Sequence, residues 1–244
     1  MQISRFYFSC FALYLTLFMT SGALQEAKSQ VLMSLLFGDD LNSETNLFGI
    51  HLNESTNHFS NFSDTKDLRS FNLGLFFGHK FNDKYMLNLE MLAKYRRGVK
   101  GISFTESDNP DINSLFAEAN AARTINYLSV PLSFRYYRTE RLFLELGPQV
   151  SMRLKAWDIF EVEENNDLVE YRRDISDQVS KFDIGYLIGI GMMVGKDKIN
   201  AIGIRHHKGF NDALKDQAGS QKHSQWAIYA NLPVGRGKMK QNEQ

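Results

Sequence analysis

Hydrophobic and polar residues alternate strictly along several segments of this chain. Within residues 141–155, Leu142, Leu144 and Leu146 share one parity, whereas Arg141 and Glu145 have the other. Successive side chains of a β-strand point to opposite faces, so a period of two predicts a strand with one apolar and one polar face. The segment is about twice as long as a common globular strand.

The same alternation recurs often enough to predict eight strands. The other clear segments are 71–81, 85–95, 128–136, 182–194, 202–204 and 226–234, and a weaker one covers 46–53. Residues 31–37 are apolar without alternation, which fits either a further strand or a lead-in segment. Because proline cannot donate a ladder hydrogen bond, we expect β-bulges at Pro131 and Pro148, which lie inside strands.

The connections between these segments alternate in length. Short turns are expected at 82–84, 139–140 and 196–197, and long polar connections at 54–69, 96–122, 156–180 and 209–222. Short turns at one end and long loops at the other are typical of an outer-membrane barrel, with the turns periplasmic and the loops extracellular. An even number of strands would bring both ends of the barrel to the periplasmic side.

The composition of the two faces decides which one meets lipid. The apolar face carries no charged residue and no glycine. The opposite face carries nine charged residues: Lys80, Glu90, Lys94, Arg135, Arg141, Glu145, Arg153, Asp183 and Arg205. It also carries eight glycines: Gly74, Gly78, Gly147, Gly185, Gly189, Gly191, Gly195 and Gly203.

A soluble lipocalin-like barrel would instead line its interior with the apolar face. Charges are costly against lipid, and small residues suit the narrow lumen of eight strands. The sequence therefore predicts an all-β fold, an eight-stranded antiparallel up-and-down transmembrane β-barrel. Aromatic residues predict two interfacial girdles: Phe81, Tyr85 and Tyr136 near the turns, and Phe71, Tyr95, Phe182 and Trp226 near the loops.

The N-terminal segment predicts export. Residues 6–24 contain no charge, and Ala27 and Ser29 supply small residues at a cleavage position before Gln30. We expect a signal peptide at 1–29, the alternative being an N-terminal membrane anchor. The remaining boundaries are a lead-in at 30–43, the barrel domain at 44–234 and a polar tail at 235–244.

Composition narrows the chemistry. The net charge of zero argues against a polybasic nucleic-acid-binding protein, so no nucleic acid is expected as a partner. The single cysteine, Cys10, lies in the apolar N-terminal stretch and excludes a disulfide framework and a thiolate zinc site. The glycines of residues 189–195 lack the spacing of a dinucleotide-binding loop. We expect no catalytic, cofactor-binding or metal site, and outer-membrane lipid is the first expected partner.

Several segments resemble the PorT-like outer-membrane β-barrel family. They are Asn126–Tyr137, Leu142–Gln149, Phe182–Tyr186, Gly203–Arg205 and Gly209–Asp212, together with Ser34–Asp39. The resemblance covers nearly the whole mature chain and implies an eight-stranded barrel in the outer membrane of a Gram-negative cell. It also implies a secretion or surface protein as a partner, because the namesake of the family is linked with type IX secretion.

The charged residues of the polar face form the one candidate site. We expect a lumen charge network of Glu90, Lys94, Arg135, Glu145, Arg153, Asp183 and Arg205. Buried charges need partners, so the three acidic residues are expected to pair with Arg135, Arg153 and Arg205. One interpretation is a salt-bridged plug. The other is an anion-preferring pore or solute site, because all nine charges of this face together sum to +3.

Histidines near the long connections leave an enzymatic alternative open. His58, His207 and His223 lie close to residues that could form a Ser–His or Asp–His pair, although no spacing distinguishes one of them. His206 and His207 point to opposite faces of one strand, so they are not expected to bind one metal ion. The favoured function is a non-enzymatic barrel with an interaction or assembly role, and the main alternative is a small-solute channel.

Overall fold

The computed structural model describes residues 42–62, 65–104, 109–164, 167–215 and 217–234. It contains the strands β1 (Asn46–Phe59), β2 (Lys66–Lys80), β3 (Tyr85–Lys100), β4 (Asn120–Tyr137), β5 (Leu142–Glu164), β6 (Asp167–Asp174), β7 (Phe182–Val194), β8 (Asn200–Gly209) and β9 (His223–Pro233). A short helix, α2 (Pro110–Phe116), and a 3-10 turn, η1 (Ser176–Gln178), lie in the connections. The predicted signal peptide, the segment 31–37 and the polar tail lie outside the described residues.

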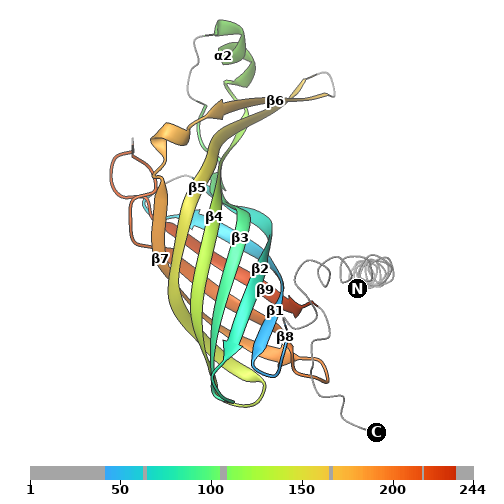
Figure 1. The fold of residues 1–244 in the computed structure, drawn as a ribbon. Helices are drawn as coiled ribbons and strands as arrows, with labels where there is room; N and C mark the ends of the chain where they lie inside the picture. The colour runs from blue at the N-terminus through green and yellow to red at the C-terminus, as the bar shows by residue number, and fades with distance from the viewer. Residues whose placement is uncertain (1–41, 63–64, 105–108, 165–166, 216, 235–244) are drawn as a thin grey trace, which may run out of the picture. The chain divides into compact units, whose positions relative to one another are not determined.

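Eight antiparallel strands close into a barrel. The order β4-β3-β2-β1-β9-β8-β7-β5 is closed by pairing of β4 with β5. Figure 1 shows these strands wrapping around one interior, with the hairpin of β5 and β6 extending beyond one end. The predicted eight-stranded antiparallel barrel is confirmed, and the weakly predicted first strand is β1, which pairs with β9.

Of the described strands, β6 alone stands outside the barrel wall. It pairs antiparallel with the last third of β5, from Trp157–Asp174 to Glu164–Asp167. The barrel and this hairpin belong to one compact unit, Thr45–Pro233. No helix in the described part of the chain is long and apolar enough to cross a membrane.

Period-two alternation sets the two faces of the wall. On β7, the side chains of Ile184, Ile188 and Ile190 are each at least half exposed, whereas Asp183 and Leu187, which have the opposite parity, are buried. The same division holds on β5, where Leu144 and Leu146 point outward and Glu145 is buried inside. The apolar face is therefore the outer face of the barrel.

The strands continue well beyond the segments that alternation revealed. Most of 54–69 and much of 96–122 and 156–180, which we expected to be loops, extend β1, β2, β3, β4 and β5 or form β6. The prediction failed there because the parts of the strands that extend past the lipid-facing apolar band do not need an apolar outer face. Without that requirement the period-two signal disappears while the backbone ladder continues.

The expected bulges at Pro131 and Pro148 are wrong. β3 and β4 pair at Leu89–Leu132 and resume in the same register at Leu92–Ser129. β4 and β5 likewise pair on both sides of Pro148 without a shift. Each proline lacks an N–H and interrupts the hydrogen bonds to one neighbouring strand. The register is kept because each proline remains paired with its other neighbour, Pro131 with Gln149 of β5 and Pro148 with Tyr186 of β7.

The irregularities lie elsewhere, and one of them reverses two predicted orientations. A register shift falls between Leu92 and Tyr95 in β3, where Lys94 has a φ of 55°. Past this bulge the faces exchange parity, so Tyr95 is buried in the interior and Lys94 is exposed outside. Tyr95 is thus not part of the outer girdle, and Lys94 is not part of the lumen. A second shift falls between Asn126 and Tyr127.

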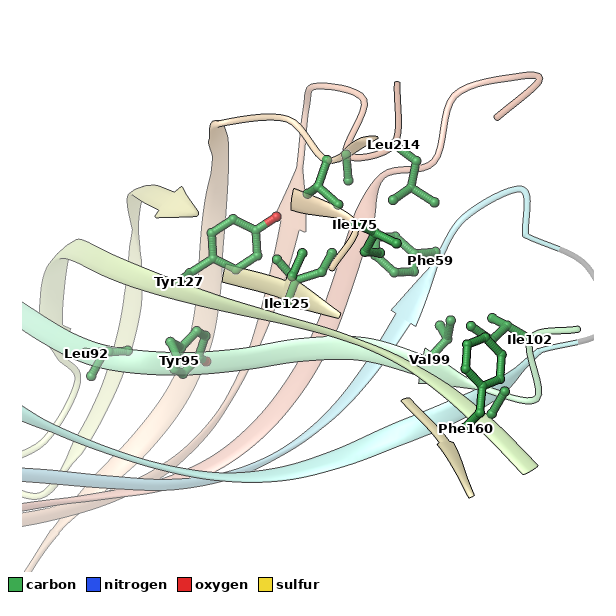
Figure 2. Packing of buried hydrophobic residues seen from close by; sticks show 14 of the residues in the cluster. Phe59, Leu92, Tyr95, Val99, Ile102, Ile125, Tyr127, Phe160, Ile175 and Leu214 are labelled. Atoms are coloured by element: carbon green, nitrogen blue, oxygen red, sulfur yellow. The ribbon is translucent and has the colours of Figure 1, made fainter. Parts of the chain in front are cut away.

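The interior is apolar near both ends. At the end with the short turns, hereafter the turn end, a cluster packs together whose buried members are Leu47, Phe76, Met86, Tyr137, Phe143, Met193 and Ala201. A larger cluster lies toward the opposite, loop end and includes Phe59, Leu92, Tyr95, Val99, Ile125, Tyr127 and Phe160. Figure 2 shows Leu92, Tyr95, Ile125 and Tyr127 projecting from β3 and β4 into this space, with Val99, Ile102 and Phe160 grouped nearby.

The loop-end cluster also draws in residues of the connections. Phe116 of α2, Ile175 before η1, and Leu214 of the connection between β8 and β9 are buried within it. α2 begins after Asn109, whose side chain accepts a hydrogen bond from the Asp111 backbone N–H, and it has Pro110 in its first turn. The loop-end cluster thus combines apolar side chains of the strands with those of these three connections.

Candidate functional site

An ion pair crosses the middle of the lumen. Arg205 of β8 donates to both carboxylate oxygens of Glu90 on β3, with Nη2–Oε2 at 2.6 Å and Nη1–Oε1 at 3.0 Å. Both side chains are buried. A Cβ on Gly189 would lie 2.8 Å from the Cβ of Arg205, so the glycine leaves room for the arginine.

His51 extends this pair toward β1 and β9. Its Nδ1 lies 2.6 Å from the amide oxygen of Asn231, and its Nε2 lies 3.0 Å from Nη2 of Arg205. These partners favour a neutral ring with the proton on Nδ1, because the arginine can only donate. Asn53 also donates to Nε2, at 2.9 Å. The ring thereby links the arginine to the amide side chains of β1 and β9.

A second ion pair connects neighbouring strands. Arg135 of β4 donates through Nε to Oε2 of Glu145 on β5 at 3.1 Å. Its guanidinium carbon lies 4.6 Å from the centre of the Phe143 ring and 5.8 Å from that of Tyr229. Arg135 therefore contacts both the ion-paired carboxylate of Glu145 and the apolar cluster at the turn end, to which Phe143 belongs.

The third pair involves an arginine that the sequence did not reveal. Arg97 of β3 donates to Oδ2 of Asp183 on β7 at 2.6 Å and to the Ser151 hydroxyl at 2.9 Å. The segment 96–122 was expected to be a loop, and Arg97 follows the bulge that changes the parity of β3. Without the bulge, the period of two along β3 would place Arg97 on the outer face. Alternation in the sequence therefore could not predict that Arg97 lies in the lumen.

The predicted network residues thus divide into two groups. The structure brings Glu90, Arg135, Glu145, Asp183 and Arg205 into the interior, each in an ion pair. Arg153 is half-buried and does not pair with Asp183, whose partner is Arg97. Lys94 is exposed outside the wall, so its assignment to the lumen was wrong.

Three further members of the predicted polar face lie at the turn end. Lys80 is the last residue of β2, and Arg141 precedes β5, where its Nη1 donates to the backbone carbonyls of Met193 and Gly195. Gly195 follows β7 with a φ of 86°, so it serves the turn and not the lumen. Among the described residues, Glu90, Glu145 and Asp183 are each paired with one arginine. A fourth buried pair, Arg123–Asp158, lies toward the loop end, so the predicted excess of +3 is not found among the paired interior charges.

Uncharged polar side chains fill the space beside these pairs. Asn53, Ser55, Asn57 and Asn72 of β1 and β2 are buried and hydrogen-bond one another or their neighbours, as with Asn72 donating to Asn53 Oδ1 at 3.0 Å. Tyr95 donates from its hydroxyl to Gln225 Oε1 at 2.7 Å. The sequence signal was present, since polar residues alternate at 51, 53, 55 and 57 in β1.

The three histidines considered for catalysis do not share an environment. His207 and His223 are buried inside the barrel, whereas His58 is exposed and lies 3.3 Å from Asp67. His223 Nε2 lies 2.9 Å from the hydroxyl of Tyr127, and His207 Nε2 lies 3.8 Å from Asp183. His206 points outward against Trp226, as its parity predicted. Across the described ranges, no group of three His, Cys, Asp or Glu side chains could hold a metal ion.

The closed eight-stranded wall, its apolar outer face and its ionic interior can be compared with known proteins. A family model described as the outer membrane protein beta-barrel domain matches residues 42–215. The chain belongs to this family. Members of the outer membrane protein beta-barrel domain family are outer-membrane proteins, so the apolar outer face meets lipid and the barrel lies in the outer membrane. The narrower resemblance to PorT-like proteins remains a prediction.

Solved outer-membrane barrels are similar in fold. Ail, the attachment invasion locus protein of Yersinia pestis, is 15% identical, with 78% of this chain and 98% of Ail covered at a TM-score of 0.39. Neisserial surface protein A is 10% identical, with 77% and 96% covered at 0.38. OprG of Pseudomonas aeruginosa is 13% identical, with 77% and 91% covered at 0.31. No curated protein sequence matches the chain.

Proposed function

We propose that this outer-membrane barrel is a non-conducting, non-enzymatic protein that binds a surface or secretion protein at its loop end. The observation that carries the proposal is the filled interior. Glu90–Arg205 and Arg97–Asp183 cross the lumen between non-adjacent strands, and an apolar cluster lies on either side of them. Eight strands enclose a lumen only wide enough for packed side chains, so these contacts leave no continuous aqueous path.

The loop end supplies the surface for binding. By the general layout of such barrels, the long connections face the outside of the cell. The β5–β6 hairpin extends there, as Figure 1 shows, and among the described strands β6 pairs with β5 alone. A strand with one unpaired edge can accept a strand of another protein. Leu168, at the start of β6, is 69% exposed and offers an apolar contact beside that edge.

The resemblance to PorT-like proteins supports a secretion-linked partner, since the namesake of that family is linked with type IX secretion. The main alternative is a small-solute channel with anion preference. The balanced interior charges weigh against it, because three arginines are each paired with a carboxylate. The burial of His207 and His223 inside the barrel disfavours an enzymatic role for these two histidines.

Planar-bilayer recording tests the closed lumen. The purified barrel should insert without producing stepwise current at ordinary voltages, whereas a sixteen-stranded porin recorded in the same bilayer serves as the positive control. Heat-modifiable gel mobility of the same protein preparation verifies that the barrel is folded. Reproducible current steps from the inserted barrel would overturn the non-conducting assignment and favour the channel.

Affinity capture from intact outer membranes tests the binding role. A tagged barrel should retain a defined surface or secretion protein, and Leu168→Glu should lose it. Lys196→Glu, at the turn end, is the matched control and should retain it, because Lys196 is exposed at the opposite end of the barrel. Equal capture by the two variants would contradict a binding surface on β6.

A further inference from the structure

Basic side chains gather on the outside of the barrel just beyond the apolar band. On β2 the last outward apolar residue toward the loop end is Phe71, which is 67% exposed, and the next outward residue is Arg69. On β3, Met91 is followed by the bulge and then by Arg96, which is also exposed. In an outer-membrane barrel, residues just beyond the apolar band lie near the level of the lipid headgroups.

These two arginines belong to a pocket with two lysines. The pocket has a volume of about 460 Å³ and lies among β2, β3, β4 and β5 at the loop end, where Figure 1 shows these strands side by side. Its cationic lining consists of Lys66, Arg69, Arg96 and Lys100, and its acidic lining is Glu161. The lining charges therefore sum to +3, and all four basic residues are exposed.

The basic residues of this pocket outnumber its acidic residues by three. None of its four basic residues forms an ion pair with any residue that the structure describes. The register of β2 and β3 also places Lys66 directly opposite Lys100. Like charges at opposite positions of an antiparallel pair destabilise it, and a bound anion would remove that repulsion. The arrangement differs from the lumen, where Arg97, Arg135 and Arg205 each have a carboxylate partner.

We propose that this pocket binds the phosphate groups of a glycolipid in the outer leaflet of the outer membrane. The planar guanidinium groups of Arg69 and Arg96 can each donate two hydrogen bonds to one phosphate, and the two lysines add compact positive charge. Apolar side chains of Leu68, Ala122 and Ile159 line the same pocket and can contact the sugar or acyl part. The position beside the apolar band favours a lipid headgroup over a soluble anion.

This site depends on the outer-membrane location of the barrel and not on the protein partner proposed above. The test uses the full-length barrel in phosphatidylcholine nanodiscs, to which bis-phosphorylated lipid A is added. Native mass spectrometry then measures the bound lipid. Wild type should bind lipid A, and Arg69→Gln/Arg96→Gln should bind it about 30-fold more weakly, as expected for two lost cationic contacts.

Three comparisons make the result decisive. Arg138→Gln/Lys196→Gln removes the same charge from exposed positions at the turn end and should bind like wild type. Lipid A without its phosphates should not bind, and inorganic phosphate should not compete, because a soluble anion lacks the membrane anchor. Heat-modifiable mobility confirms that each variant is folded. Equal binding of phosphorylated and dephosphorylated lipid A, or equal losses in the two double variants, would overturn the proposal, as would full competition by inorganic phosphate.

Discussion

Glu90 and Arg205 face each other across the barrel, 115 residues apart in sequence, with the carboxylate and guanidinium 2.6 Å apart. Glu90 lies on β3 and Arg205 on β8, and three strands separate them in either direction around the wall. The pair therefore crosses the lumen from one side to the opposite side. A side chain on each wall reaches the middle because eight strands leave a narrow interior.

Breaking this pair by removing one partner should be strongly destabilising. In Glu90→Ala the guanidinium of Arg205 remains buried without its carboxylate, and such a loss costs about 3–5 kcal/mol. Urea unfolding in lipid vesicles, followed by tryptophan fluorescence, measures the change in free energy. Glu90→Leu/Arg205→Met removes both charges and should cost less than the single change. An equal or larger loss in the double variant would contradict the ion-pair explanation.

Two lumen glycines should differ in how they tolerate alanine. At Gly147 a Cβ would collide with the Leu132 carbonyl oxygen and lie 2.8 Å from the Ser133 Cα, and neither backbone group can move independently. Leu132 and Ser133 are the two residues of β4 at which the pairing of β4 with β5 is interrupted, opposite Pro148 and Gly147. We expect Gly147→Ala to cost about 1–3 kcal/mol through overpacking.

Gly78 provides the matched control for that change. A Cβ there would meet the terminal methyl group of Met86, which is the end of a flexible side chain. Gly78→Ala should therefore cost clearly less than Gly147→Ala in the same urea unfolding measurement. A larger loss at Gly78 would show that the close backbone approach at Gly147 is not the limiting contact.

Asp174 should show a pH dependence confined to the base of the β5–β6 hairpin. Hydrogen bonds from the Ser176 hydroxyl and from its backbone N–H, the latter at 2.8 Å, lower the pKa of Asp174. Because the pKa is lower in the folded state, the charged carboxylate stabilises this turn at any pH above the ordinary aspartate pKa of about 3.9. This stabilisation is lost as the pH falls through the lowered pKa of the folded state. Because the carboxylate is exposed, we expect a local effect.

An NMR titration of the Asp174 carboxyl carbon measures this shift directly. The folded barrel should titrate below the ordinary aspartate value. Ser176→Ala removes the hydroxyl and should move the pKa back toward that value. An unshifted Asp174 in the unaltered protein would contradict the hydrogen-bonded geometry.

The sequence predicted the barrel because lipid and the lumen impose opposite requirements on alternate residues. Leu144, Glu145 and Leu146 show this directly, since each lies on its predicted face. The same rule failed at Lys94, where a bulge that no local composition indicates exchanged the two faces. Because Arg97 follows that bulge, the true partner of Asp183 could not be predicted.

The strand extensions could not be predicted for a different reason. Above the membrane, Phe160 is buried by Phe104 and Tyr171 from other segments, and no lipid constrains the residues that alternate with it. The candidate network was accessible to sequence analysis only where charges sit in regularly alternating strands, as at Glu90, Glu145 and Arg205. The apolar clusters depend on contacts between distant segments, which alternation does not encode.

The last prediction separates the two structures that close the lumen, the loop-end cluster and the ion pairs beneath it. Phe160 is fully buried in the cluster, so Phe160→Ala should destabilise the loop end by about 3–5 kcal/mol. Hydrogen exchange should then show lower amide protection in β6 and α2, while the Glu90–Arg205 layer keeps its protection. The variant should still conduct no current, because the Glu90–Arg205 and Arg97–Asp183 pairs still cross the lumen. Stepwise current from Phe160→Ala would mean that the loop-end cluster, and not the ionic layer, keeps the barrel closed.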